Sequence, residues 1–234
     1  MLEVSGLEVA YGSFQVLWGV DLTVVEGEVV CLLGPNGSGK STIMNAVTAL
    51  VPHIGGSITF AGESLSGVPT YEMSERGLAH VLERRRLFPT LTVRQNLLLG
   101  AWHPAAKARR DETLARVEKL FPLLAERADT KAHVLSGGQQ QMVAIARGLM
   151  SRPRLLMIDE PFLGLAPAIV DDICAVIAQI NKEGVAVLFT EQNVELALSM
   201  SRRGYLLESG RIALTGAGTE MLQSDVVRKV YLGI

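Results

Sequence analysis

Three short runs of almost uninterrupted apolar residues are the strongest pattern along the chain: Val29–Leu33, Leu155–Ile158 and Val185–Phe189. Each run has the length of a β-strand that is buried on both faces, and such strands are typical of parallel sheets. Between the runs, apolar residues recur at the spacing of amphipathic helices. These helical repeats are Ile43/Val47/Leu50, Met142/Ile145/Ala146/Leu149 and Ile169/Ile173/Val176/Ile177/Ile180. Strands that alternate with helices predict an α/β fold with a mostly parallel sheet.

Further strands are predicted towards both ends of the chain. Leu2–Ala10, Val20–Val25 and Ser57–Phe60 read as strands separated by turn signals, and we expect them to form an N-terminal antiparallel β-layer. Gly204–Glu208 and Arg211–Thr215 lie on either side of a Ser-Gly turn, which predicts a hairpin.

The middle of the chain has a different pattern. Strand-like runs disappear between about residues 86 and 151, where helical segments such as Glu112–Leu120 and Gln139–Met150 are separated by prolines. We therefore expect a single domain over residues 1–234, with a core made of 1–85 and 152–234 and an inserted helical subdomain at 86–151.

Composition narrows the class of protein. The 234 residues are 48% hydrophobic and 20% charged, which excludes a disordered chain, and a net charge of −2 gives no basic footprint for nucleic acid. Cys31 and Cys174 have no neighbours at disulfide-framework or zinc-site spacing. No run approaches the roughly 20 apolar residues of a membrane-spanning helix, and the first residues do not resemble a secretion signal. We expect a soluble, intracellular chain.

A glycine-rich loop follows the first apolar run and matches the phosphate-loop pattern GxxxxGK[ST] in full. Its backbone N–H groups and the start of the next helix are suited to surround phosphate. Lys40 supplies a charge for the β- and γ-phosphates, the Ser41 hydroxyl is a ligand for Mg²⁺, and Thr42 is a further donor. The predicted phosphate-binding residues are Gly34, Pro35, Asn36, Gly37, Ser38, Gly39, Lys40, Ser41 and Thr42.

Two adjacent carboxylates, Asp159 and Glu160, end the second apolar run. Ligands collect at this end of the strands in a parallel sheet. Asp159 is the candidate for holding Mg²⁺ through water, and Glu160 is the candidate for polarising the water that attacks the γ-phosphate.

The segment Leu135-Ser136-Gly137-Gly138-Gln139 opens the helix that precedes this second run. Its hydroxyl and backbone N–H groups form a second anion cradle, although Ser136 is also explained as a helix cap. In this order the phosphate loop, LSGGQ and the apolar segment ending in Asp-Glu resemble the ATP-binding subunit of an ABC transporter, over essentially the whole chain.

The resemblance implies a P-loop NTPase (RecA-like) core that binds ATP and Mg²⁺. In that family LSGGQ of one subunit covers the γ-phosphate held by the phosphate loop of another. A second, homologous ATP-binding chain, a transmembrane permease and, indirectly, a substrate-binding protein are therefore the expected partners. The chain would be peripheral on the inner face of the cell membrane. Tyr11 matches the family's aromatic residue that stacks on adenine, with Val16 on the same wall; simple packing also explains Tyr11.

Two positions depart from the common family pattern. Glu83 stands where Gln usually joins the core to the helical subdomain; its carboxylate is suited to Mg²⁺, although a turn charge is the simpler alternative. Gln192 stands where a switch histidine is expected. An amide can bind phosphate but does not change charge near neutral pH, and Gln192 is the third candidate catalytic residue beside Lys40 and Glu160.

These departures, with the segments Phe88–Leu97, Leu163–Pro167 and Glu191–Leu198, resemble the second ATP-binding subunit of branched-chain amino acid importers. That group typically has Pro-Glu-Gly-Arg-Arg where this chain has Leu-Glu-Arg-Arg-Arg at 82–86, so coupling or cargo are expected to differ, unless Arg84–Arg86 form only a solvated basic face. Losing Gly costs backbone freedom if that position needs a positive φ.

Three functions follow from the sequence. The main hypothesis is an ATPase that energises uptake of branched-chain or other hydrophobic amino acids. One alternative is an ATP-gated, low-turnover partner in a heterodimeric importer for urea or another small polar solute. Another is an ABC ATPase that acts on DNA or ribosomes, against which the short helical insert and the near-neutral charge argue. Cargo and homo- or heterodimeric pairing stay open.

Overall fold

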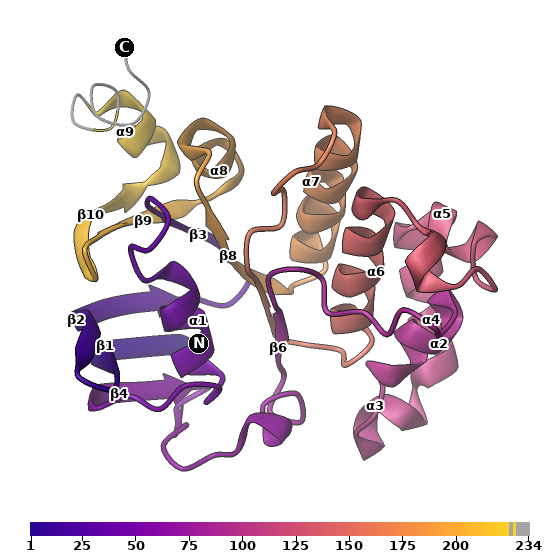
Figure 1. The fold of residues 1–234 in the computed structure, drawn as a ribbon, viewed down its shortest axis with the longest axis horizontal. Helices are drawn as coiled ribbons and strands as arrows, with labels where there is room; N and C mark the ends of the chain where they lie inside the picture. The colour runs from indigo at the N-terminus through magenta and orange to yellow at the C-terminus, as the bar shows by residue number, and fades with distance from the viewer. Residues whose placement is uncertain (225–226, 228–234) are drawn as a thin grey trace. The chain divides into compact units, whose positions relative to one another are not determined.

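The computed structural model describes residues 1–224 and residue 227. It divides into two compact units. The first contains residues 1–71 and the described residues from 186 onward, and the second contains residues 72–185. Figure 1 shows the helices and strands of each unit. The expected boundaries of the core and the helical subdomain, at 86 and 151, stay a prediction, and residues 225, 226 and 228–234 lie outside the described part.

The first unit contains an antiparallel sheet with strand order β2-β1-β4-β5. Its strands are β1 (Leu2–Tyr11), β2 (Phe14–Val24), β4 (Gly55–Phe60) and β5 (Glu63–Ser64). Buried and exposed positions alternate along much of β1 and β2, as expected for a sheet with one face on a core. The predicted antiparallel layer is confirmed. Strand β2 begins at Phe14 rather than at residue 20, because Gly12, with φ of 61°, lets the chain turn back directly after β1.

The same unit contains four strands of a mostly parallel sheet, in the order β10-β9-β3-β8. They are β3 (Val29–Leu33), β8 (Ala186–Glu191), β9 (Arg203–Glu208) and β10 (Arg211–Ala217). Strand β3 runs parallel to both neighbours, β8 and β9, and all of its residues are buried. The C-terminal hairpin is present as the antiparallel pair β9 and β10. Burial on both faces explains the continuous apolar run of β3.

The helices of the first unit are α1 (Lys40–Val47), α8 (Val194–Met200) and α9 (Gly218–Gln223), with a 3₁₀ turn at Thr70–Glu72 where the unit ends. Helix α1 follows the phosphate loop, as predicted. It ends at Val47, however, so Leu50 does not continue its buried stripe and is exposed. The chain leaves the helix through Ala49, whose φ of 54° is left-handed and cannot propagate a right-handed helix.

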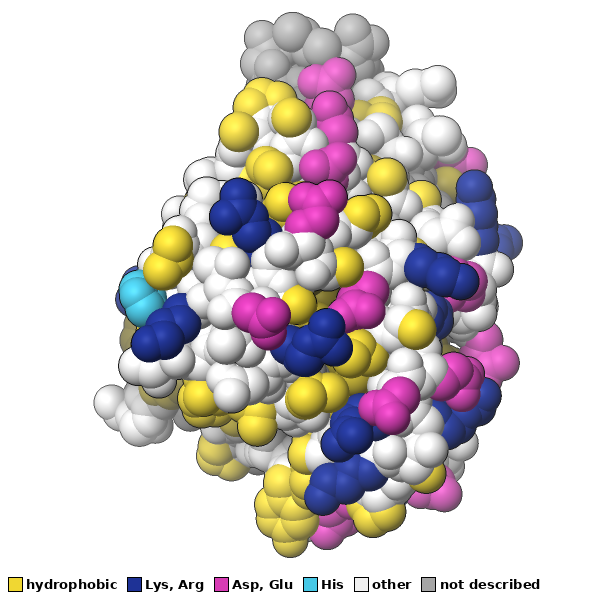
Figure 2. All heavy atoms as spheres, turned by 90° about the vertical axis from the view of Figure 1, so that its right-hand side faces the viewer, with side chains coloured by type: hydrophobic (Ala, Val, Ile, Leu, Met, Phe, Trp, Pro, Cys, Tyr) yellow, Lys and Arg dark blue, Asp and Glu magenta, His cyan; other side chains and the backbone are white. Residues whose placement is uncertain are grey.

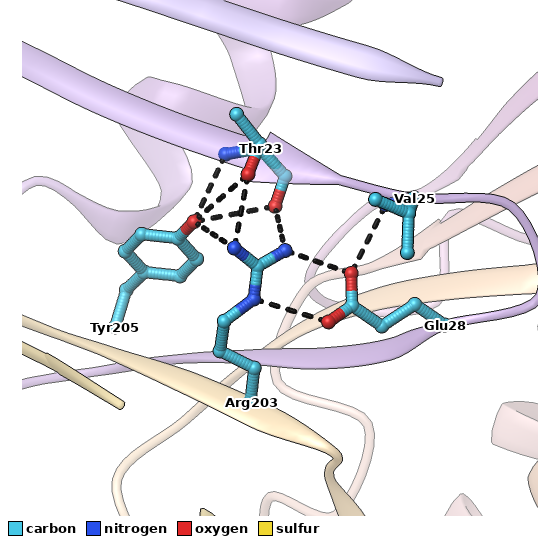
Figure 3. Close-up of polar contacts among 5 residues, drawn as sticks. All are labelled: Thr23, Val25, Glu28, Arg203 and Tyr205. Atoms are coloured by element: carbon cyan, nitrogen blue, oxygen red, sulfur yellow. Dashed lines mark hydrogen bonds and ion pairs between the residues drawn. The ribbon is translucent and has the colours of Figure 1, made fainter. Parts of the chain in front are cut away.

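The buried Glu28 forms an ion pair with the partly buried Arg203 at the amino end of β3 and β9 (Figure 3). The Glu28 carboxylate accepts hydrogen bonds from Arg203 Nε and Nη2, at 3.0 and 2.8 Å, and from the backbone N–H of Val25, at 3.0 Å. Arg203 Nη2 also donates to the carbonyl of Thr23, and Arg203 Nη1 donates to the Tyr205 hydroxyl. This network connects β2 to β9, at the end of β3 opposite the phosphate loop.

The second unit contains a parallel strand pair, β6 (Leu78–Val81) and β7 (Leu155–Ile158), in register from Leu78 opposite Leu155 to Val81 opposite Ile158. The sequence predicted β7 but not β6. Strand β6 has only four residues, one of them His80, so its pattern is too short to distinguish from a loop.

The remaining elements of the second unit are helical. They are α2 (Val93–Leu99), α3 (Pro104–Ala108), α4 (Arg110–Leu120), α5 (Pro122–Glu126), α6 (Gly137–Leu149) and α7 (Pro167–Lys182), with a 3₁₀ turn at Ala132–Val134. Figure 2 shows the side of the molecule that carries α2 to α5, where acidic, basic and apolar side chains are interspersed below a column of acidic side chains at the top of the view. Ion pairs such as Arg109–Glu112 and Arg116–Glu183 account for part of this mixture. Within the described residues, no helix has the length and apolar character needed to cross a membrane.

Candidate functional site

The phosphate loop connects β3 to α1 and depends on glycines in left-handed conformations. Gly34, Gly37 and Gly39 have φ values of 149°, 80° and 110°. Side chains are also excluded by contact, because a Cβ on Gly34 would lie 2.3 Å from the carbonyl oxygen of Leu207 and one on Gly39 would lie 2.6 Å from Leu17 Cδ2. The loop therefore holds its shape only with glycine at these positions.

Two polar side chains are buried inside this loop. Lys40 Nζ donates hydrogen bonds to the carbonyl oxygens of Gly34, at 2.8 Å, and Pro35, at 3.1 Å. Ser38 Oγ is buried and has no hydrogen-bond partner among the described residues. A buried hydroxyl without a partner is costly, and a phosphate oxygen is the kind of acceptor that would satisfy it. The interior of the loop thus fits the predicted nucleotide.

Tyr11 and Val16 belong to the same unit as the loop. Tyr11 ends β1 and is 49% exposed, so about half of its surface is accessible. Val16 lies in β2, and its Cγ1 is 3.5 Å from the position that a Cβ on Gly39 would occupy. Val16 therefore lies against the phosphate loop itself, whereas stacking of Tyr11 on adenine stays a prediction.

Strand β8 ends beside the strand that leads into the phosphate loop, because Glu191 is in register with Leu33. The exposed Gln192 follows in the turn before α8, and Asn193 caps that helix. The buried Glu191 carboxylate accepts hydrogen bonds from the backbone N–H groups of Gln192, at 2.7 Å, and Asn193, at 2.9 Å. Sequence reasoning did not select Glu191 as a site residue, although a carboxylate that ends an apolar run was the available signal.

In the second unit the carboxylates follow two adjacent parallel strands at the same edge. Asp159 comes directly after β7, is buried, and its N–H donates to the carbonyl of Val81 in β6 at 2.9 Å. Glu160 has a left-handed φ of 46°, a conformation that costs energy in a non-glycine residue and that is typical of functional positions. Glu83 follows β6 by two residues, is partly exposed and pairs with Arg84 Nε at 3.5 Å.

The LSGGQ segment begins α6 and forms a complete capping box. Ser136 Oγ accepts from the N–H of Gln139 at 3.3 Å, and Gln139 Oε1 accepts from the N–H of Ser136 at 3.0 Å. A Cβ on Gly138 would lie 2.8 Å from Ile169 Cγ2. The cap that sequence analysis left as an alternative for Ser136 is therefore present, and it is compatible with anion binding by the first N–H groups of the helix.

Burial fixes the protonation of two groups near these strands. It raises the pKa of the Cys31 thiol in β3 to about 12, so this cysteine is a protonated, unreactive core residue at neutral pH. Burial also lowers the pKa of His80 in β6 to about 4, which keeps the imidazole neutral. Both cysteines are free. In the described part, no group of three or more His, Cys, Asp and Glu side chains is placed to hold a metal ion.

The predicted site residues thus form two sets. The first unit brings together the phosphate loop, Val16 and the turn with Gln192, and it also carries Tyr11. The second unit brings Asp159, Glu160 and Glu83 to one strand edge, and it also carries Ser136–Gln139. The predicted donors for Mg²⁺, namely Ser41, Asp159 and Glu83, are divided between the two sets.

Comparison with known proteins gives consistent matches over the whole chain. The family model described as ABC transporter matches residues 17–163. The chain is 42% identical to the high-affinity branched-chain amino acid transport ATP-binding protein BraG of Pseudomonas aeruginosa, over 100% of both chains. It is 34% identical to the lipopolysaccharide export system ATP-binding protein LptB of Escherichia coli K12, over 99% of this chain and 97% of LptB.

Two solved structures are also similar. The ADP conformation of MJ1267, an ATP-binding cassette of an ABC transporter, is 26% identical with a TM-score of 0.87 and covers 100% and 99% of the two chains. The dimeric post-hydrolysis state of the ATP-binding cassette MJ0796, bound to ADP and Pi, is 26% identical with a TM-score of 0.79 and covers 93% of this chain and 98% of that one.

A fully buried parallel strand leading into a glycine-rich phosphate loop, in a chain that also carries LSGGQ at a helix start, defines a P-loop nucleoside triphosphatase of the ATP-binding cassette type. The chain belongs to the ABC transporter family, and it is an ATPase. The predicted fold class, family and enzymatic activity are confirmed.

Proposed function

We propose that this chain is the ATP-hydrolysing subunit of an importer for branched-chain or other hydrophobic amino acids. The observation that carries the proposal is the full-length identity of 42% to BraG, with the phosphate loop and LSGGQ intact. The LptB relative serves an export system, and its lower identity favours the amino acid assignment. A permease would hold the chain at the inner face of the membrane, and a substrate-binding protein would deliver the cargo.

The proposed reaction needs two ATP-binding chains arranged head to tail. The phosphate loop of one chain binds the β- and γ-phosphates through its backbone N–H groups, Lys40 and the Ser38 hydroxyl. The first N–H groups of α6 in the opposing chain cover the γ-phosphate. The dimeric MJ0796 structure, bound to ADP and Pi, supports such a pair. ATP brings the two chains together and its hydrolysis separates them, which moves the permease.

Hydrolysis itself is assigned to Glu160. Its carboxylate accepts a hydrogen bond from the water that attacks the γ-phosphorus, and the new P–O bond forms as the bond to the β,γ-bridging oxygen breaks. Ser41, Asp159 and Glu83 would supply the hydroxyl and carboxylate oxygens that Mg²⁺ prefers. When bound, Mg²⁺ neutralises charge on the phosphates. Gln192, held in its turn by Glu191, is suited to donate a hydrogen bond to the γ-phosphate.

The test uses the purified Glu160→Gln variant, which keeps the size of the side chain but lacks a base. We expect ATP turnover to fall by about a hundredfold or more. Light scattering should give a dimer mass with ATP and Mg²⁺ and a monomer mass with ADP. Asp171→Asn, an exposed carboxylate-to-amide change in the same unit, is the matched control and should behave as wild type. Undiminished turnover in Glu160→Gln would reject the catalytic assignment, and a monomer in both nucleotides would reject self-pairing.

A second candidate is a low-turnover partner in a heterodimeric importer for urea or another small polar solute. Gln192 in place of a titratable histidine, and Glu83 in place of glutamine, favour it. Trapping ADP in the assembled heterodimer distinguishes the two functions. Unequal trapping supports the low-turnover role, and equal trapping in both sites rejects it.

A further inference from the structure

The turn after β6 contains three consecutive arginines in the left-handed region. Arg84, Arg85 and Arg86 have φ values of 62°, 64° and 44°. A left-handed conformation costs an L-residue about 1–2 kcal/mol, and it is uncommon at a single non-glycine position. Three in succession require that the surrounding structure fixes this segment.

The contacts that hold the segment come from α2 and α6. Arg147 Nη2 of α6 donates to the carbonyl oxygen of Arg85 at 3.3 Å, and its guanidinium lies 5.9 Å from the centre of the Phe88 ring. Asn96 of α2 is fully buried and binds Phe88 at both backbone groups: its Oδ1 accepts from the N–H at 2.9 Å and its Nδ2 donates to the carbonyl at 3.0 Å. The path of the chain on the C-terminal side of Arg85 is therefore fixed relative to α6.

Because the backbone is fixed in this way, the Arg85 side chain lies next to Gly137, the first residue of α6. A Cβ at Gly137 would be only 3.1–3.3 Å from Arg85 Nη2, Nη1 and Cζ, so the guanidinium occupies the space next to this glycine. Arg85 forms no ion pair with a carboxylate of the described residues. The adjacent arginines differ, because Arg84 pairs with Glu83 and both Arg84 and Arg86 are exposed.

This placement is unfavourable without an anion. The N-terminus of a helix carries a partial positive charge, and a cation beside it is repelled. The capping box also occupies the N–H groups of Ser136 and Gln139, so only those of Gly137 and Gly138 stay available for an anion. The N–H groups of Gly137 and Gly138 are uncharged donors. An anion placed there would gain a strong, charge-assisted bond from a guanidinium already at that position.

We propose that Arg85 is a γ-phosphate-binding residue of the composite ATP site: its guanidinium completes the LSGGQ cradle and binds the nucleotide presented by the opposing chain. This inference rests on the proposed function, and in particular on self-pairing. It also gives the positive charge at this segment a role beyond a solvated basic face. The backbone strain is then the cost of bringing that charge to Gly137.

The test measures ATP-dependent pairing and ADP binding separately, in the Glu160→Gln background. Arg85→Ala and Arg85→Gly are compared with the matched controls Arg86→Ala and Arg86→Gly, whose side chain is exposed. The glycine variants tolerate the left-handed backbone, so they keep the fold if alanine does not. Light scattering gives the ATP concentration for half-maximal dimer, and fluorescence of a labelled ADP gives the affinity of the monomer.

We expect both Arg85 variants to need about tenfold more ATP than the parent for half-maximal dimer, with unchanged ADP affinity, and the Arg86 variants to match the parent. Dimerisation of the Arg85 variants at the parent's ATP concentration overturns the inference and leaves the proposed function standing. Equal losses of ADP affinity and pairing overturn it as well, because they indicate a structural role. A parent that stays monomeric rejects self-pairing, and this inference with it.

Discussion

Ser38 is a residue that favours ligand binding while it lowers the stability of the free protein. Its hydroxyl is buried inside the phosphate loop without a hydrogen-bond partner among the described residues. A buried polar group in this condition costs roughly 1–3 kcal/mol. The nucleotide would recover that energy, so the same residue should lower the stability of the free protein and raise its affinity for phosphate.

Replacing Ser38 by Ala should therefore separate the two effects. We expect the free energy of unfolding without nucleotide to stay the same or rise by about 1 kcal/mol, while the affinity for ADP falls several-fold. Urea unfolding and fluorescence of labelled ADP are the two measurements. Ser66→Ala, an exposed position in the same unit, is the control. A variant that is less stable and binds ADP as the wild type does would contradict the assignment.

At the level of elements, the strands that present the phosphate loop are fixed at their opposite end. Glu28 precedes β3 and is buried, and its carboxylate is bound by Arg203 of β9 through two nitrogens (Figure 3). The hydrogen bonds that Arg203 donates to Glu28 raise the pKa of Arg203 above its ordinary value. Removing Arg203 would leave the buried Glu28 carboxylate without its counter-charge, which costs more stability than losing both partners.

We expect Arg203→Met to lower the free energy of unfolding by about 2–3 kcal/mol at pH 7. Adding Glu28→Gln should restore part of the lost free energy of unfolding, because the uncompensated carboxylate charge is then removed. Urea unfolding of the two variants measures both steps, with the exposed neighbour Arg202→Met as control. Equal losses of unfolding free energy in the Arg202 and Arg203 variants would show that the ion pair with Glu28 does not contribute to stability.

For the whole molecule, the important feature is that the phosphate loop and LSGGQ belong to different compact units. In the proposed function, a nucleotide held by one chain contacts the phosphate loop of that chain and the α6 terminus of the opposing chain. ADP bound to a monomer should then affect the phosphate loop and leave the LSGGQ segment unchanged, whereas ATP in a closed pair should affect both segments.

Amide hydrogen exchange tests whether ADP and ATP affect these two segments differently. We expect ADP and Mg²⁺ to protect amides of Gly37–Thr42 and to leave those of Gly137 and Gly138 unchanged. ATP and Mg²⁺ with Glu160→Gln should protect both sets. Amides of β4, which carries none of the predicted site residues, provide the internal reference. Protection of Gly137 and Gly138 by ADP at a protein concentration that gives only monomer would contradict the head-to-tail arrangement.

The sequence predicted those parts of the protein that depend on neighbouring residues. The phosphate loop requires glycines, lysine and serine at fixed spacing, and LSGGQ requires a helix start, so both were placed correctly on β3, α1 and α6. The buried strands β3 and β7 were equally clear because continuous apolar runs need no distant partner to be recognised. The antiparallel layer and the C-terminal hairpin followed from turn residues and strand propensity.

Only the tertiary structure decided the features that join distant segments. Strand β6 is too short to be recognised alone and is defined by its pairing with β7. The pair Glu28–Arg203 joins residues whose charges look like ordinary surface charges in the sequence. The arginine segment after β6 carries no signal that selects Arg85 over its neighbours, because that choice depends on α2 and α6 fixing the backbone beside Gly137. Local spacing determines motifs and elements, whereas contacts between residues far apart in sequence depend on the packed fold.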